Sequence, residues 1–200
     1  MASAESGGGA VPPGGDATLP TFRPTGDEVL HRGWMITLDR AGFIDPAGVA
    51  FDRDVVRHPG AVAVVAVTHD DAVVLVRQYR PAIDEWILEI PAGTCDVAGE
   101  PPEEAARREL AEEVGVAAER LEPLTRCANS PGFCDQRTWV YLATELIAVP
   151  VDRQGIEEGY MRIEHIPLSR FDAMVDDGSI IDSTTILGVG LARRRLASRP

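Results

Sequence analysis

The sequence predicts a mixed α/β protein in which a mixed β-sheet is flanked by helices. Short apolar runs typical of strands recur along the chain, and one clearly bounded helix lies near its middle. Two of the apolar runs, 61–67 and 72–76, are separated by His69, Asp70 and Asp71 and nearby polar residues, which indicates a hairpin. A strict βαβ alternation is absent, so a mixed sheet is favoured over a doubly wound parallel sheet.

Composition narrows the class of protein. The 200 residues are 44% hydrophobic and 26% charged, which suits one domain with a sizeable core. The net charge of −13 repels a phosphate backbone, so we expect no nucleic-acid partner. No apolar run approaches the roughly 20 residues of a membrane helix, and no secretory signal is present. Three cysteines without metal-type spacing favour a reducing, cytoplasmic setting.

The N-terminal quarter divides into a tail and a strand region. Residues 1–24 are rich in Gly, Pro, Ala and Ser and are expected to be a disordered tail. Residues 25–58 carry short apolar alternations, which predict two or three strands broken at Gly42 and at Pro46–Gly48. Residues 59–200 are expected to form the main domain.

The most clearly marked element is a helix over residues 103–114. Two prolines precede it, where a missing N–H costs little, and Gly115 follows it as a C-terminal stop. Its buried stripe is expected to be Ala106, Leu110 and Val114, which recur every four residues. A short strand over 86–90 comes before it and ends at Pro91.

The remainder of the chain continues the mixed pattern. Strands are expected near 121–128, 137–146 and 160–166, and helices near 169–176 and 183–197. The last helix begins well at Asp182 or Ser183, and Arg193–Arg195 suit the negative end of its dipole.

Three carboxylates on the central helix are candidates for a functional site. Offsets of three and four place Glu109, Glu112 and Glu113 on one face, which we expect opposite the apolar stripe. A solvated acidic face is the ordinary interpretation of such a run. The alternative is a cation site, because hard divalent ions take carboxylate oxygens and Mg²⁺ is usually shared with substrate phosphates. Such an ion would also let an acidic protein bind an anionic pyrophosphate.

The sequence around this helix resembles the Nudix box, a loop–helix–loop with the pattern G-x5-E-x7-R-E-U-x-E-E-x-G-U. The matching residues run from Gly93 through Glu100 to Arg108–Glu113 and Gly115–Val116. One departure exists, because six residues rather than five separate Gly93 from Glu100. The resemblance implies the Nudix α/β/α sandwich with an N-terminal strand extension.

The resemblance also implies a metal site for Mg²⁺, with Mn²⁺ as a substitute. Glu109 and Glu113 would be the main ligands, and Glu112 would be a further ligand with a part in catalysis. The carbonyl of Ala92 would be a ligand as well. Arg108 would serve catalysis by orienting a glutamate.

The flanking segments resemble the ADP-ribose pyrophosphatase branch of the family. They are RDVVRHPGAV over 53–62, VRQYR over 76–80, residues 86–93 and NSPGF over 129–133. The likeness implies that Arg53 and Arg80 contact substrate, and a guanidinium suits a bidentate hold on phosphate. Trp86 is a further candidate contact. This chain has Asp54 and Gln136 where the branch usually has Glu.

A catalytic carboxylate is expected from a late loop. The acidic segment 154–159 is flanked by glycines, so it can move and close over a substrate. Glu157 is the first candidate and Glu158 the second. An exposed acidic turn is the alternative interpretation.

The function implied is metal-dependent hydrolysis of the pyrophosphate of a nucleoside diphosphate sugar, with ADP-ribose giving AMP and ribose 5-phosphate. Another nucleotide sugar or a dinucleotide is the first alternative substrate. A nucleotide sensor without hydrolysis is the second alternative, and the retained glutamates disfavour it. The likeness further implies a homodimer in which residues 25–58 pack against a partner and Arg53 serves the neighbouring site.

Overall fold

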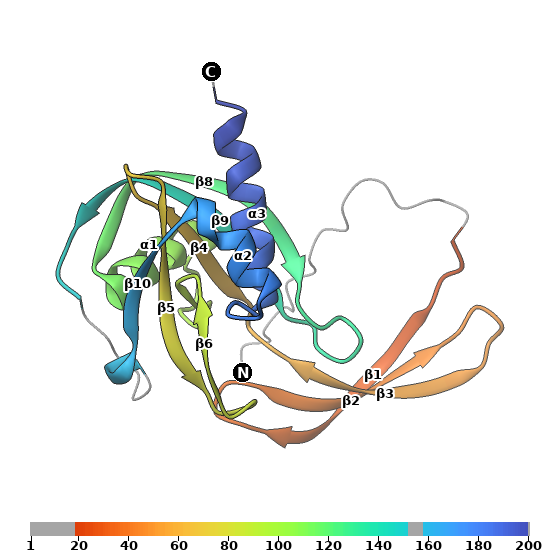
Figure 1. Cartoon of the computed structure of the whole chain (residues 1–200). Helices are drawn as coiled ribbons and strands as arrows, with labels where there is room; N and C mark the ends of the chain where they lie inside the picture. The colour runs from red at the N-terminus through yellow and green to blue at the C-terminus, as the bar shows by residue number, and fades with distance from the viewer. Residues whose placement is uncertain (1–18, 152–157, 200) are drawn as a thin grey trace.

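The N-terminal strands form a separate antiparallel sheet that projects from the rest of the chain (Figure 1). The computed structural model describes residues 19–151 and 158–199. This first sheet has the order β1-β2-β3, with bounds Arg23–Arg32, Thr37–Ile44 and Ala50–Arg57. The expected break at Pro46–Gly48 is confirmed, but the break at Gly42 is wrong. Gly42 pairs with Gly26 and Asp52 inside β2, and a Cβ there would overlap Thr25.

The second sheet is mixed, as the sequence predicts. Its main path runs β10-β5-β4-β9-β8, with β6 paired to β5 and β7 paired to β4. Only the β4–β9 pairing among these is parallel. The strands are β4 (Ala61–Val67), β5 (Ala72–Arg80), β6 (Glu85–Glu89), β7 (Ala92–Thr94), β8 (Val116–Ala128), β9 (Arg137–Ala148) and β10 (Arg162–Pro167).

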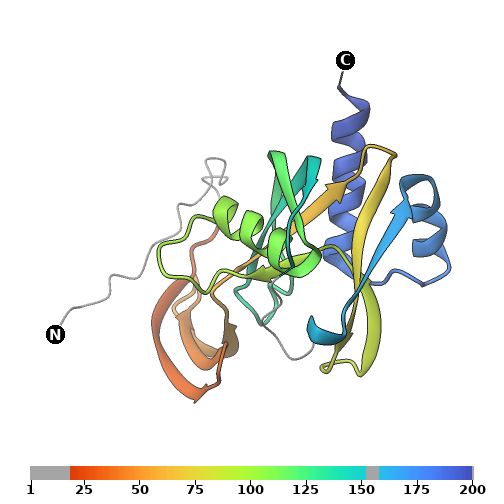
Figure 2. The same ribbon diagram turned by 90° about the vertical axis from the view of Figure 1, so that its left-hand side faces the viewer.

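Helices cover both faces of this sheet (Figure 2). Alternate residues of a strand point to opposite faces, so β4 serves two cores. Val62 and Val64 pack with Leu110 of α1 (Pro102–Val114), while Ala63 and Val65 pack with α3 (Ser183–Ala197). The α/β/α arrangement expected from the sequence is therefore confirmed.

The helix ends follow the sequence signals. Gly115 adopts the left-handed conformation, φ 66°, and its N–H donates to the Ala111 carbonyl at 3.0 Å. Asp182 caps α3 by accepting the Thr185 N–H at 2.7 Å. The helix expected near 169–176 is divided into the 3₁₀ turn η2 (Leu168–Arg170) and α2 (Phe171–Asp176). No helix in the described ranges is long and apolar enough to cross a membrane.

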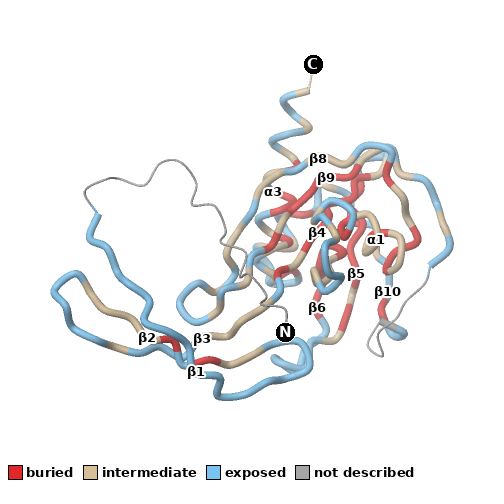
Figure 3. Tube along the Cα trace, turned by 180° about the vertical axis from the view of Figure 1, so that it is seen from behind, coloured by how far each residue is buried: buried red, intermediate tan, exposed pale blue. Residues whose placement is uncertain are grey.

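Burial is concentrated in the second sheet, while the N-terminal sheet is mostly exposed (Figure 3). Among the described residues of β1, β2 and β3, only Asp39 and Ala41 are buried. The strand β1 begins at Arg23, inside the range expected as tail, and residues 1–18 lie outside the described ones. Contacts of Arg57 and the bridge between Val56 and Cys134 join this sheet to the main domain.

Candidate active site

The free edge of β7 is the structural centre of the site. Gly93 of β7 pairs with Val62 of β4. On either side, the Val64 N–H donates to the Pro91 carbonyl at 2.8 Å, and the Cys95 N–H donates to the Gly60 carbonyl at 3.1 Å. Antiparallel strands alternate the direction of their backbone groups, so the N–H and C=O of Ala92 point away from β4. Glu113 reaches this edge, where its Oε2 accepts the Ala92 N–H at 3.0 Å. The Ala92 carbonyl and the Glu113 carboxylate therefore share one edge.

The box glutamates are not a solvated face. Glu113 is only 4% exposed and lies beside the apolar stripe, so its expected position opposite the stripe is wrong. It follows Leu110 by three residues, an offset that keeps two side chains on neighbouring parts of a helix surface. Glu109 packs against Gly93, and a Cβ on Gly93 would overlap its carboxylate. Glycine at this position lets the carboxylate approach the β7 backbone.

Arg108 joins three carboxylates in one network. Its Nε and Nη2 donate to Glu100 at 3.1 and 3.0 Å, and its Nη1 donates to Glu109 at 2.7 Å and to Glu112 at 3.2 Å. The hydrogen bonds that Arg108 donates to Glu100 raise the pKa of Arg108 above its ordinary value. The same hydrogen bonds lower the pKa of Glu100.

The additional residue of the loop does not separate Glu100 from this network. It is accommodated in a turn where Gly99 has φ 81° and the Glu100 N–H donates to the Val97 carbonyl at 3.1 Å. Glycine enters this left-handed region without steric cost. The turn therefore takes up the extra length before the helix begins.

These donors fit a hard divalent cation by their chemistry. Carboxylate and carbonyl oxygens are the ligands that such ions prefer, and two of them already meet at the β7 edge. Within 19–151 and 158–199, however, no three acidic, His or Cys side chains are already arranged around one cation position. Arg108 accounts for part of this, because it holds Glu109 and Glu112. A cation would therefore compete with the guanidinium for these two carboxylates.

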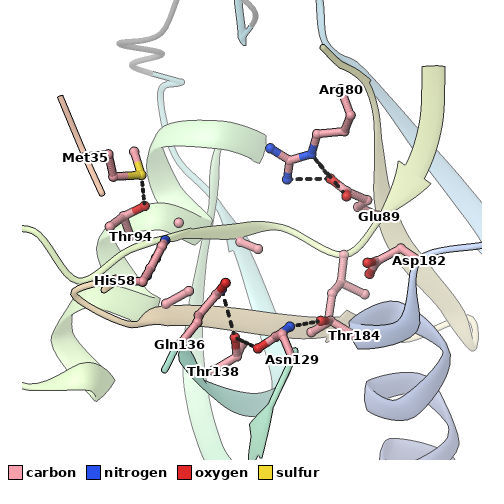
Figure 4. A pocket seen from close by; sticks show the side chains of 14 residues that line it. Met35, His58, Arg80, Glu89, Thr94, Asn129, Gln136, Thr138, Asp182 and Thr184 are labelled. Atoms are coloured by element: carbon pink, nitrogen blue, oxygen red, sulfur yellow. Dashed lines mark hydrogen bonds and ion pairs between the residues drawn. The ribbon is translucent and has the colours of Figure 1, made fainter. Parts of the chain in front are cut away.

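A cavity of about 430 Å³ opens on the other side of β7 (Figure 4). The register places Ala92 and Thr94 on the α3 side of the strand and Gly93 on the α1 side. The cavity thus lies across β7 from Glu109, and the two regions meet at the strand's free edge. Its lining is Met35, His58, Ala61, Arg80, Glu89, Ile90, Ala92, Gly93, Thr94, Asn129, Gln136, Thr138, Asp182 and Thr184.

One end of the cavity is charged. Arg80 forms an ion pair with Glu89, with Nη2 and Oε2 2.7 Å apart, and Gln78 also donates to this carboxylate. Burial raises the pKa of Glu89, and the hydrogen bond and charge of Arg80 oppose that shift. Glu89 could not be identified from the sequence, because a single acid inside an apolar strand pattern gives no distinct signal.

The opposite end is lined by uncharged groups. Asn129 accepts from the Thr138 hydroxyl at 2.7 Å and donates to Thr184 at 3.1 Å. Gln136 donates to Thr138 in a longer contact of 3.4 Å. His58 and Met35 lie near Thr94 at this end (Figure 4).

The remaining residues expected at the site are placed away from it or are not described. Arg53 lies on β3, with its guanidinium 4.7 Å from the Phe51 ring centroid, outside the cavity lining. Trp86 is half exposed and packs against Tyr79, with ring centroids 5.8 Å apart. Glu157 lies outside the described residues. Glu158 begins the short helix η1 (Glu158–Tyr160).

Comparisons with known proteins agree with this geometry. The NUDIX domain family model matches residues 57–177. The chain is 39% identical over 168 residues to "ADP-ribose pyrophosphatase" of Mycobacterium tuberculosis, covering 84% of this chain and 81% of that protein. It is also 39% identical to "Methanol dehydrogenase activator" of Bacillus methanolicus, covering 81% and 87%. A solved structure described as "Crystal structure of ADP compounds hydrolase" superposes with a TM-score of 0.76 at 24% identity, covering 89% and 94%.

The three-layer fold and the glutamate-bearing helix at the edge of β7 define a Nudix-type domain. The chain belongs to the Nudix domain family. Members of this family are enzymes that generally use divalent metals. The relative named ADP-ribose pyrophosphatase supports a small-molecule nucleotide as the substrate.

Proposed function

We propose that the protein hydrolyses the pyrophosphate bond of ADP-ribose with one water to give AMP and ribose 5-phosphate. Mg²⁺ is the proposed cation, and Mn²⁺ can replace it. The main supporting observation is the meeting of Glu109, Glu113 and the Ala92 backbone at the edge of β7, beside a cavity that contains Arg80. This juxtaposition brings cation ligands and a phosphate-binding guanidinium to one place.

Each residue has a distinct part in the proposed reaction. Glu109 and Glu113 bind the cation with the Ala92 carbonyl, and Glu112 adds a further oxygen. When bound, the cation offsets the charge of the pyrophosphate and promotes ionisation of a water. Arg108 orients two of these glutamates, since it donates to both Glu109 and Glu112.

Arg80 is proposed to orient a phosphate from the charged end of the cavity. Its Nε and Nη2 also contact Glu89, so the side chain is held before substrate arrives. A side chain fixed in this way loses less entropy on binding than a free one. Trp86, on the neighbouring strand β6, is proposed as a contact for the nucleotide base.

Glu157 or Glu158 is proposed to accept the proton of the attacking water. Support comes from the strand that follows them: Arg162 of β10 is paired with Arg77 of β5, three residues before Arg80. Glu158 in η1 therefore comes four residues before the start of β10, a strand paired with the one that carries Arg80. A carboxylate just before such a strand is a suitable source for the proton acceptor.

The protein is further proposed to act as a cytoplasmic homodimer. Large exposed apolar side chains on the N-terminal sheet and on its β1–β2 turn support this, because exposed apolar surface is typical of interaction sites. Trp34, 97% exposed, and Val29 and Leu30 belong to this surface. In the dimer, Arg53 would reach the site of the neighbouring subunit. Sedimentation analysis of the purified protein, with Arg53→Gln and Glu113→Gln mixed to test complementation between subunits, examines both points.

A substrate panel tests the activity. ADP-ribose, ADP-glucose, GDP-mannose, UDP-glucose and NADH are incubated with Mg²⁺ or Mn²⁺, and a phosphatase frees the terminal phosphate for detection. Glu113→Gln is the control, because its amide oxygen can still accept the Ala92 N–H. ADP-ribose turning over fastest, with the control inactive, supports the proposal. A different leading substrate retains the hydrolase chemistry and overturns the choice of ADP-ribose.

A regulatory role toward a partner enzyme is the second candidate. One relative is named as an activator of a dehydrogenase, at 39% identity. The complete set Glu109, Glu112 and Glu113 favours hydrolysis over binding alone. Nucleotide binding without turnover of any compound in the panel, under both cations, would favour regulation.

A further inference from the structure

His58 lies at the uncharged end of the cavity, and none of the proposed chemical steps uses it. The residue is on the cavity lining, facing the region between Met35, Thr94 and Gln136 (Figure 4). It follows β3 directly and is partly buried. The charged lining residues Arg80, Glu89 and Asp182 are at the other end of the cavity.

The surrounding backbone fixes the tautomer of this imidazole. The Gly60 N–H donates to His58 Nδ1 at 3.0 Å, so Nδ1 acts as an acceptor and carries no proton. A neutral imidazole that accepts at one nitrogen donates at the other. The remaining proton is therefore on Nε2. Among the described residues, none accepts a hydrogen bond from Nε2.

Gly60 can make this contact only because it is glycine. Its φ is 105°, a region that other residues rarely adopt, and a Cβ would lie 2.9 Å from the Trp139 ring. Its carbonyl accepts the Cys95 N–H at 3.1 Å, which ties it to the box loop. The acceptor state of Nδ1 is thus set by a rigid backbone contact.

A second contact holds the backbone of His58, from which the imidazole extends. The backbone N–H of His58 donates to Asp135 Oδ1 at 2.9 Å, and Asp135 Oδ2 accepts from Arg57 at 3.2 Å. Arg57 also holds Asp27 and Asp39 of the N-terminal sheet. Burial lowers the pKa of His58, and the charge of Asp135 opposes this shift. The charge that acts on His58 is therefore that of Asp135, which itself pairs with Arg57.

Gln136, next to Asp135, supplies the complementary atom. Its amide nitrogen donates to Thr138, which leaves Oε1 as the acceptor on this side chain. No described residue donates to Oε1. Among the residues that the structure describes, no Lys or Arg lines the cavity at this end, where a donor and an acceptor are available. They suit a hydroxyl group, which can accept and donate at once, better than a phosphate.

We propose that His58 determines specificity by donating its Nε2 proton to a ribose hydroxyl of the substrate, with Gln136 Oε1 as the neighbouring acceptor. This inference rests on the proposed hydrolysis of ADP-ribose. The hydroxyl belongs either to the terminal ribose or to the adenosine ribose. The two reaction products distinguish these sources, because each contains one of the two sugars.

The first test compares two isosteric variants. His58→Gln retains an amide donor close to the position of Nε2, whereas His58→Asn retains an acceptor close to Nδ1 and loses the donor. We expect His58→Asn to raise KM for ADP-ribose about three- to tenfold with kcat within about twofold, the range of one neutral hydrogen bond. His58→Gln should recover most of this loss. His69→Asn is the control, since His69 is 98% exposed in the β4–β5 turn.

The second test detects the contact itself. In protein labelled with ¹⁵N-histidine, the His58 ring should show the Nε2–H tautomer, and its Nε2 resonance should shift with AMP or with ribose 5-phosphate in the presence of Mg²⁺. A shift with one product assigns the hydroxyl to that product's ribose. No shift at saturation with either product, or equal KM for His58→Asn and wild type, overturns the proposal. Absence of ADP-ribose turnover by wild type counts against the proposed function, and the product titrations still decide the role of His58.

Discussion

Arg108 binds Glu100 through two parallel hydrogen bonds, from Nε to Oε1 at 3.1 Å and from Nη2 to Oε2 at 3.0 Å. The pair connects the loop before α1 with the helix itself, eight residues later. The same guanidinium donates to Glu109 and Glu112. Arg108 therefore acts on both the loop conformation and the position of the proposed cation ligands.

Replacing Arg108 with Lys should lower activity by about 10- to 100-fold, because an ammonium cannot make the two parallel bonds and the ligands lose their support. Circular dichroism should show a retained fold. Arg107→Lys is the matched control, since Arg107 contacts Glu103 and the Ala118 carbonyl instead of the box glutamates. Equal activity of the two variants would contradict the supporting role of Arg108.

The same substitution should change the titration of Glu100. Its pKa is lowered by the hydrogen bonds from Arg108, so the pair contributes stability above the ordinary carboxyl pKa. That contribution is lost as pH falls through the lowered pKa. In Arg108→Lys the pKa should move back toward its ordinary value, and carboxyl NMR can follow it. An unchanged Glu100 titration would show that Arg108 does not set this pKa.

Gly93→Ala tests the approach of Glu109 to β7. The new Cβ would overlap the Glu109 carboxylate, which is the flexible end of a side chain and can move. We therefore expect a retained fold with a displaced ligand, a higher Mg²⁺ requirement and an activity loss of at least about 10-fold. Gly190→Ala, where no atom lies within 4 Å of the new Cβ, is the control. Wild-type Mg²⁺ dependence in Gly93→Ala would contradict a ligand role for Glu109.

Replacing Arg80 tests its contribution to protein stability apart from its contribution to substrate binding. Arg80→Gln leaves Glu89, 6% exposed, without its cationic partner, so the pKa of Glu89 should rise further. Because Arg80 is partly exposed, we expect a loss of about 1–2 kcal/mol at neutral pH. When the folded state raises the pKa of a carboxyl, the free energy of unfolding falls as pH rises through that pKa. The variant should therefore regain stability in mild acid.

The double variant Arg80→Gln with Glu89→Gln provides the control for this pair. It removes the buried charge, so urea unfolding should return close to wild-type stability. KM for ADP-ribose should be raised in both Arg80→Gln and the double variant, because both lack the proposed phosphate contact. Recovery of KM together with stability would show that Arg80 has only a structural role.

The sequence predicted the elements better than their packing. Proline, the acidic first turn and Gly115 mark α1 locally, so its ends could be predicted within one residue. The burial of Glu113 could not be predicted in this way, because it depends on contact with Ala92, 21 residues earlier. His58 and Asp135 meet across 77 residues, and no local pattern marks that contact. Glu89 was not identified for the same reason, since its partners are defined by strand pairing.

The packing of α3 against the sheet can be tested with two glycines of the same helix. A Cβ on Gly188 would lie 3.0 Å from Val65 and 3.2 Å from both Ile90 and Val140, whereas Gly190 has open space around it. Both Gly→Ala changes gain about 0.5–1 kcal/mol of helix propensity, so the difference between the two variants measures packing alone. We expect Gly188→Ala to be less stable than Gly190→Ala by about 1–3 kcal/mol in urea unfolding. Since Ile90 lines the cavity and its N–H donates to Thr185 of α3 at 2.9 Å, Gly188→Ala should also raise KM. Equal stability of the two variants would mean that α3 does not approach β4 as closely as the structure places it.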